Sequence, residues 1–302
     1  MKHTFKITLI LIFIFLFAQI IGLVIINTYI DSQKTQESGE TTFTGLPFNI
    51  ERPEVDESTS FIYIMIAVLI GTGLLLLLIK YRKMRLWKFW FFLSVLITLT
   101  IALAAFINEI FALSLAFVLA IAKIYRPNVY VHNFTEVLIY GGLAAIFVPM
   151  INMFSVFMLL FFISIYDFYA VWKSKHMVKL AEFQTSTKLF SGLFIPYKKE
   201  EKEKTTEKEG KLVKVKNAIL GGGDIGFPLI FAGVTLKTLI DSGVARNIAF
   251  FESFIVVVTS TIALFWLLIK SKKDKFYPAM PFISIGCFLG YVLILLLNSI
   301  LF

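Results

Sequence analysis

Long apolar runs alternate with short polar segments along nearly the whole chain. Most of these runs approach the roughly 20 residues that an α-helix needs to cross the hydrocarbon core of a bilayer. The expected spans lie at roughly 4–29, 60–79, 87–107, 110–122, 133–149, 151–172, 217–238, 247–269 and 279–302. The pattern therefore predicts an all-α membrane protein with nine transmembrane helices.

Composition supports a single polytopic membrane domain over residues 1–302. Of its residues, 58% are hydrophobic and only 16% are charged, which is more apolar surface than a soluble domain of this length needs. Spans one to six are expected in 1–172, a hydrophilic loop in 173–216 and spans seven to nine in 217–302. The single cysteine, Cys287, and three scattered histidines argue against disulfides and metal sites. No cofactor, no metal and no nucleic-acid partner is expected.

The basic residues predict how the spans are oriented. With nine spans, 25 of the 29 lysine and arginine residues fall on the side of the N-terminus, twelve of them in 173–216. The loop 30–59 on the other side carries seven acidic residues. Cytoplasmic loops of membrane proteins are enriched in lysine and arginine. The bias predicts a cytoplasmic N-terminus, an external C-terminus and a location in the cell membrane.

The loop at 173–216 divides into three parts. Residues 173–195 have an amphipathic pattern that predicts a helix lying at the membrane interface. Residues 198–210 form a mixed-charge run typical of a solvated linker. Residues 211–216 alternate and contain two valines, which predicts a strand just before span seven.

Two aspartates lie inside predicted spans, where ionisable groups are costly and usually functional. Asp167 precedes Lys173 by six residues, and Asp224 follows Lys216 by eight. At about 1.5 Å per helical residue, both sit roughly 9–12 Å inside the cytoplasmic edge. Spans six and seven run antiparallel, so this matched depth indicates that the two carboxyl groups meet.

The glycine-rich stretch around Asp224 supplies a reason for such a meeting. Residues 221–228 contain four glycines and a proline, and glycines let another backbone approach closely. Two adjacent carboxyl groups cannot both ionise easily, so one keeps its proton. The ionised member can then take a proton from water while the other donates to a peptide carbonyl. Asp167 and Asp224 are therefore predicted as the catalytic pair of an aspartyl protease, with neither role assigned to either residue.

Three short motifs resemble those of the presenilin and signal peptide peptidase family of intramembrane aspartyl proteases. Tyr166-Asp167 is similar to its YD motif, and Gly221-Gly222-Gly223-Asp224 is similar to its GxGD motif. Pro278-Ala279-Met280-Pro281 is similar to its PAL motif, with methionine in place of leucine. They occur in order on the expected spans six, seven and nine. The lysine distribution favours the presenilin branch, and the compact chain resembles the microbial, archaeal homologues.

The resemblance implies further roles for residues of this chain. It implies that Asp167 and Asp224 are catalytic and that the 278–281 segment shapes the site and helps hold substrate. It also implies that residues 211–216 pair with an unwound substrate as a β-strand. Tyr166, Gly221, Gly222 and Gly223 are expected around the site. The implied partners are transmembrane peptides or single-span membrane proteins within the lipid bilayer, and the oligomeric state stays open.

Two other functions fit part of the pattern. Paired carboxylates beside broken helices also occur in cation- or proton-coupled transporters, but no internal repeat is apparent. Prepilin-type peptidases share a GxGD motif, but they resemble shorter chains with fewer spans. The remaining acidic residues near span ends, Glu109, Glu136, Asp241 and Glu252, are expected to reach headgroups or water and not the site.

Overall fold

The computed structural model describes residues 4–81, 83–174, 180, 183, 189–198, 215–272 and 277–301. Ten α-helices dominate this part of the chain. They are α1 (Phe5–Thr28), α2 (Ser32–Ser38), α3 (Ser60–Lys80), α4 (Met84–Ala104), α5 (Glu109–Tyr125), α6 (Val129–Phe147), α7 (Met153–Phe168), α9 (Gly222–Asp241), α10 (Arg246–Lys270) and α11 (Met280–Leu301). Two strands, β1 (Gly192–Lys198) and β2 (Val215–Gly221), form an antiparallel hairpin.

Eight of these helices are long and apolar enough to cross a membrane, counted over the described residues. They are α1, α3, α4, α6, α7, α9, α10 and α11, the sixth and seventh expected spans being α7 and α9. The fourth expected span, 110–122, corresponds to α5, which has 17 residues and is not among the eight. The prediction of a helical, multi-pass integral membrane protein is thus confirmed.

Helix α9 lies at the centre of the bundle and is in contact with α1, α6, α7, α10 and α11. Most of its side chains from Ile225 to Leu239 are buried. The fully buried ring of Phe231 packs against Phe157 of α7 and Phe288 of α11, with centroids 5.1 and 5.8 Å away. This aromatic contact joins the three helices that carry the sequence motifs.

The hairpin corrects the expected start of span seven. Residues 217–221 belong to β2, so the helix begins at Gly222 and not at residue 217. Pairing with β1 satisfies the backbone groups of this segment that face β1, and consecutive glycines are poor helix formers. The expected strand at 211–216 is present at residues 215 and 216, whereas 211–214 lie outside the described residues.

The expected interfacial helix over 173–195 is wrong at its C-terminal end. Residues 192–195 form the first part of β1, because their backbone pairs with residues 218–221. Helix α7 continues into a π-helical turn, Tyr169–Lys173. Of the linker expected at 198–210, the first residue, Lys198, is the last residue of β1, and 199–210 lie outside the described residues.

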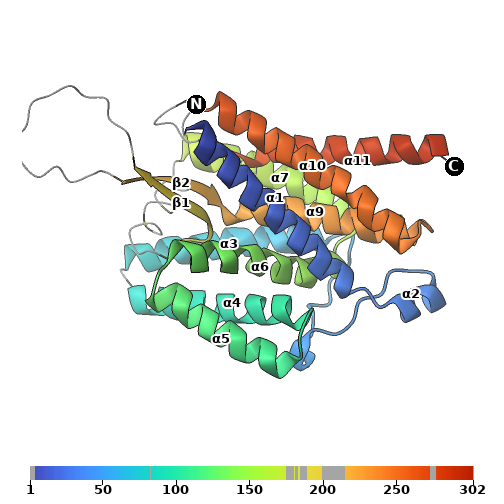
Figure 1. Ribbon diagram of the computed structural model, residues 1–302, viewed down its shortest axis with the longest axis horizontal. Helices are drawn as coiled ribbons and strands as arrows, with labels where there is room; N and C mark the ends of the chain where they lie inside the picture. Colours follow the sequence, from blue (N-terminus) through green and yellow to red (C-terminus); the bar gives the residue numbers. More distant parts are fainter. Residues whose placement is uncertain are drawn as a thin grey trace, which may run out of the picture.

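The two ends of the bundle differ (Figure 1). Helix α1 begins at the end that carries the β1–β2 hairpin, and α11 finishes at the opposite end, where α2 also lies. The loop containing α2 is tied to the last turn of α9, because Thr41 N–H donates to the Asp241 carboxylate over 2.6 Å. The hairpin therefore stands at one face of the bundle, next to the beginning of α9.

Candidate active site

Asp167 occupies the last turn of α7, just before the π-helical turn, and only 6% of its surface is exposed. The backbone N–H of Met280 donates to its Oδ2 over 3.2 Å, and the N–H of Ala279 also bonds the carboxyl group. Both donors precede or begin α11, where helix N–H groups have no partner within the helix. The 278–281 segment thus holds the Asp167 side chain through its backbone.

Asp224 is the third residue of α9, and its carboxyl group bonds back to the backbone N–H of Gly221, the N-cap residue. This geometry is half of a capping box, and it places a carboxyl group where the helix dipole favours negative charge. Pro228, one turn later, cannot donate the usual hydrogen bond to the Asp224 carbonyl. The start of α9 is thus a capped turn in which the Asp224 carbonyl lacks the usual helical hydrogen bond.

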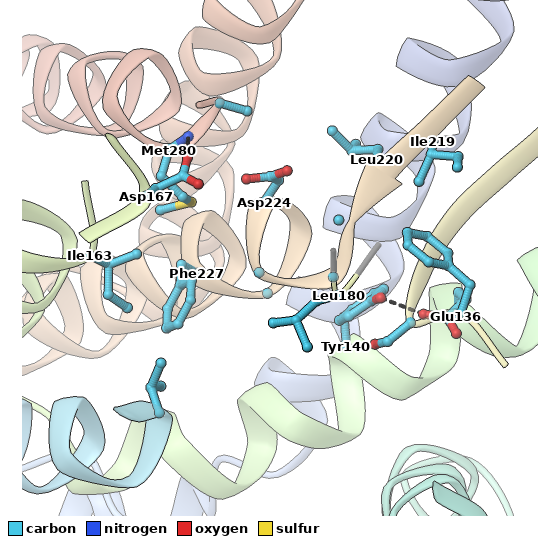
Figure 2. A pocket seen from close by; sticks show the side chains of 18 of the residues that line it. Glu136, Tyr140, Ile163, Asp167, Leu180, Ile219, Leu220, Asp224, Phe227 and Met280 are labelled. Atoms are coloured by element: carbon cyan, nitrogen blue, oxygen red, sulfur yellow. Dashed lines mark hydrogen bonds between the residues drawn. The ribbon is translucent and has the colours of Figure 1, made fainter. Parts of the chain in front are cut away.

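Asp167 and Asp224 line one cavity of about 770 Å³. Figure 2 shows the two carboxyl groups reaching into it from different helices and facing each other. The structure therefore brings the carboxyl groups of α7 and α9 to one cavity.

The other residues singled out from the motifs gather around the same space. Those that line the cavity are Tyr166, Gly221, Gly222, Gly223, Ala279 and Met280. The hydroxyl of Tyr166 donates to Thr72 Oγ1 of α3 over 3.4 Å. Pro278 is buried just before Ala279, and Pro281 lies in the first turn of α11, where a proline costs no hydrogen bond.

Glu136 contradicts the expectation that it reaches headgroups or water. It is 1% exposed on α6, and its carboxylate accepts from Lys123 Nζ over 2.7 Å and from the backbone N–H of Gly192 over 3.0 Å. The hydroxyl of Tyr140 also donates to it (dashed line in Figure 2). Lys123, counted in the sequence among loop cations, is likewise buried. Glu136 and Tyr140 both border the cavity.

Gln19 of α1 makes a second buried polar contact that the sequence did not predict. Its side chain is fully buried and donates through Nε2 to the carbonyl of Ile225 over 2.8 Å. Ile225 follows Asp224 directly, so this bond fixes the first turn of α9 from the side of α1. A lone glutamine in a long apolar run is the sequence feature that could have pointed to it, because such a side chain needs a partner in the membrane.

Comparison with known proteins identifies the family. The family profile described as "Signal-peptide peptidase, presenilin aspartyl protease" matches residues 14–300. The chain belongs to this family. Two solved structures of a presenilin family intramembrane aspartate protease, in space groups C222 and P2, share its fold. They superpose with TM-scores of 0.62 and 0.60, at 20% and 21% identity, covering 96% and 95% of this chain and 99% and 96% of theirs. No individually curated protein matches the chain.

Membership of the presenilin and signal peptide peptidase family makes this protein an intramembrane aspartyl protease, that is, a peptide hydrolase. A cation- or proton-coupled transporter is not favoured. The family implies that its substrates are transmembrane segments within the bilayer.

Gly222 leaves room for the Tyr140–Glu136 contact, which gives a first prediction. A Cβ at this position would lie 2.7 Å from Tyr140 Oη and 2.9 Å from Ser191 Oγ. We expect Gly222→Ala to lower kcat/KM several-fold by displacing the first turn of α9, and Tyr140→Phe to restore part of the loss in the double variant. Gly71→Ala is the control, because no atom lies within 4 Å of its Cβ position. Equal activity of Gly222→Ala and Gly71→Ala would show that the first turn of α9 accommodates a Cβ atom at position 222 without displacement.

Proposed function

We propose that this protein hydrolyses peptide bonds inside transmembrane segments of membrane proteins or signal peptides, with Asp167 and Asp224 as the catalytic pair. The observation that carries the proposal is the cavity in which the two carboxyl groups face each other. Each accepts a hydrogen bond from the backbone of a different segment, Asp167 from Met280 at the start of α11 and Asp224 from Gly221 at the end of β2. Held in this way, they need little reorganisation before reaction.

The reaction follows from one proton shared by the pair. The ionised carboxylate takes a proton from a water molecule as its oxygen attacks the scissile carbonyl carbon. The protonated carboxyl donates its proton to the carbonyl oxygen, which gives a neutral tetrahedral intermediate. The carboxyl group that took the water proton then gives it to the amide nitrogen, while the other carboxylate removes a proton from a hydroxyl of the intermediate. The C–N bond breaks, and one proton is again held by the pair. The products are a new carboxyl group and a new amine, with no covalent enzyme intermediate.

We further propose a nine-span topology in which α5 is the additional span. Its 17 residues extend about 25 Å, which is close to the hydrocarbon thickness. The placement of α1's start and α11's end at opposite ends of the bundle supports an odd number of crossings (Figure 1). The lysine distribution supports a cytoplasmic N-terminus and hairpin, an external C-terminus and a cell-membrane location.

The hairpin supports recognition of the substrate by strand addition. The N–H and C=O of Phe194 in β1 both bond Asn133 of α6, over 3.0 and 2.9 Å, so they point away from β2. Directions alternate along a strand, so Leu193 and Ile195 face β2 and pair with Leu220 and Ala218. By the same alternation, the N–H and C=O of Ile219 point away from β1.

This outer edge of β2 runs into the cavity. Ile219, Leu220 and Gly221 all line it, and the N–H of Gly221 points to the Asp224 carboxyl group. A substrate strand joined to Ile219 would thus continue towards the catalytic pair in extended form. Extension matters because a helix hides its peptide carbonyls from attack.

Ile219→Pro tests strand addition. Proline removes the outward N–H of residue 219 and none of the bonds between β1 and β2, and proline is tolerated at such edge positions. We expect the KM for a transmembrane substrate to rise roughly tenfold, which corresponds to about one hydrogen bond. Ala218→Pro is the contrast, because it removes an inward N–H and disrupts the hairpin. An unchanged KM in Ile219→Pro would exclude pairing at this edge.

The function itself is tested with purified protein in liposomes that contain a single-span peptide. We expect mass spectrometry to find cleavage within the apolar segment, and reaction in H₂¹⁸O to place one ¹⁸O atom in the new carboxyl group. Cleavage only outside the membrane, or none across peptides of varied sequence, would contradict the proposal.

A further inference from the structure

The outer edge of β1 is covered by side chains of α6. The carboxylate of Glu136 accepts from Gly192 N–H over 3.0 Å, and His132 Nε2 lies 2.8 Å from the Gly192 carbonyl. Asn133 accepts from the N–H of Phe194 and donates to its carbonyl. Four backbone groups of one strand edge are thus bonded by three side chains. An exposed edge would otherwise be a template for pairing with any extended chain.

The spacing of these side chains follows from helix geometry. His132 and Glu136 are four residues apart and Asn133 and Glu136 are three apart, so all three lie on one face of α6. His132 and Glu136, on successive turns of α6, both reach Gly192. Asn133 reaches Phe194, the next residue along β1 that faces away from β2.

Lys123 of α5 fixes the protonation and orientation of this group. Its Nζ lies 2.7 Å from Glu136 Oε1, 3.0 Å from Thr135 Oγ1 and 3.3 Å from His132 Nδ1. Lysine can only donate, so Nδ1 accepts and the ring proton is on Nε2, where it donates to the Gly192 carbonyl. Lys123 thus orients both His132 and Glu136 towards β1.

We propose that His132, Asn133 and Glu136 form a clamp that holds β1 so that only the β2 edge can accept a substrate strand. They are positioning residues, since they act on the substrate through the hairpin, and the proposal rests on the proposed function. The clamp fixes which edge is available and where Ile219 lies relative to Asp224. Proline at position 196, the next outward-facing residue of β1, extends the block, because it has no N–H to offer.

The clamp has two measurable consequences. Without it, the outward N–H of Phe194 loses its partner and exchanges with solvent. The hairpin also becomes free to shift, so an incoming substrate must first order it and KM rises. Simple loss of folded protein behaves differently, because it lowers the apparent kcat and leaves KM unchanged. The split between KM and kcat thus separates positioning from a general effect on folding.

The experiment uses the full-length protein in detergent or liposomes with Asn133→Leu, which removes both bonds to Phe194. Hydrogen exchange of peptides covering 189–198 is measured without substrate, and kinetics are measured on a single-span peptide. We expect at least roughly tenfold faster exchange at Phe194 and a KM increased roughly tenfold with kcat within about twofold. Asn133→Asp keeps the acceptor for Phe194 N–H and is expected to fall between.

Asn298→Leu is the matched control. This asparagine also makes a side-chain hydrogen bond, to Glu252 over 3.1 Å, but it lies near the C-terminal end of α11, away from the hairpin. It should change neither hairpin exchange nor KM. Unchanged exchange in Asn133→Leu, or faster exchange with an unchanged KM, would overturn the clamp. The exchange measurement needs no proteolysis, so a failure of the proposed protease activity is distinguishable from a failure of the clamp.

Discussion

Replacement of either Asp167 or Asp224 by asparagine is expected to abolish proteolysis. An amide can neither take a proton from water nor donate one as an acid, and general acid–base groups typically contribute roughly 10²–10⁴-fold to rate. Asparagine keeps the shape of the side chain, and its oxygen can still accept from Met280 or Gly221. We therefore expect kcat to fall at least roughly 10³-fold in each single variant with little change in substrate binding.

Several controls make this result specific. The double variant should be no slower than either single variant, because the two groups act as a unit. Asp241→Asn, at the far end of α9, should retain activity, since its carboxylate bonds the backbone of Thr41 away from the cavity. Wild-type kcat/KM should fall at both low and high pH, because the pair needs one proton, neither none nor two. Normal cleavage by either single variant would disprove the paired mechanism.

The proposed catalytic pair was predictable because the distance of a residue from the membrane edge can be counted along the sequence. An aspartate inside an apolar run stands out, and the nearest lysines locate the membrane edge. The count of residues from that edge placed Asp167 and Asp224 at one level, although part of the second count runs along β2 and not along a helix. The expectation that the two carboxyl groups lie close together was unaffected, because β2 leads directly into α9 at its N-cap residue, Gly221, three residues before Asp224.

The clamp was not predictable, for two physical reasons. A short apolar run such as residues 193–195 fits a strand or a helix equally well, so the pattern over 173–195 predicts a helix across the first part of β1. Lys123 and Glu136 each fall near a predicted span end, where solvent is the default partner of a charge. The sequence did offer one indication of this ion pair. Lys123 and Glu136 carry opposite charges and belong to two helices joined by a short connection.

The second large effect is expected from the Lys123–Glu136 ion pair. Both side chains are 1% exposed and their charged atoms are 2.7 Å apart. Removing one member of a buried pair leaves a charge without compensation and typically costs about 3–5 kcal/mol. Lys123→Met keeps the length of the side chain, so we expect the free energy of unfolding to fall by about that amount. Denaturant titration in detergent measures it.

A second ion pair in the same protein supplies the matched comparison. Lys237 Nζ also lies 2.7 Å from a carboxylate, that of Glu57, but the Glu57 side chain is 44% exposed. Glu57 can reach water when Lys237 is replaced, so Lys237→Met should cost much less than Lys123→Met. Adding Glu136→Gln to Lys123→Met should recover part of the loss, because the amide oxygen still accepts from Gly192 and Tyr140 without an unpaired charge. Equal costs for the two lysine variants, or no recovery in the double variant, would mean that burial of the Lys123–Glu136 charges does not determine the stability of this corner of the fold.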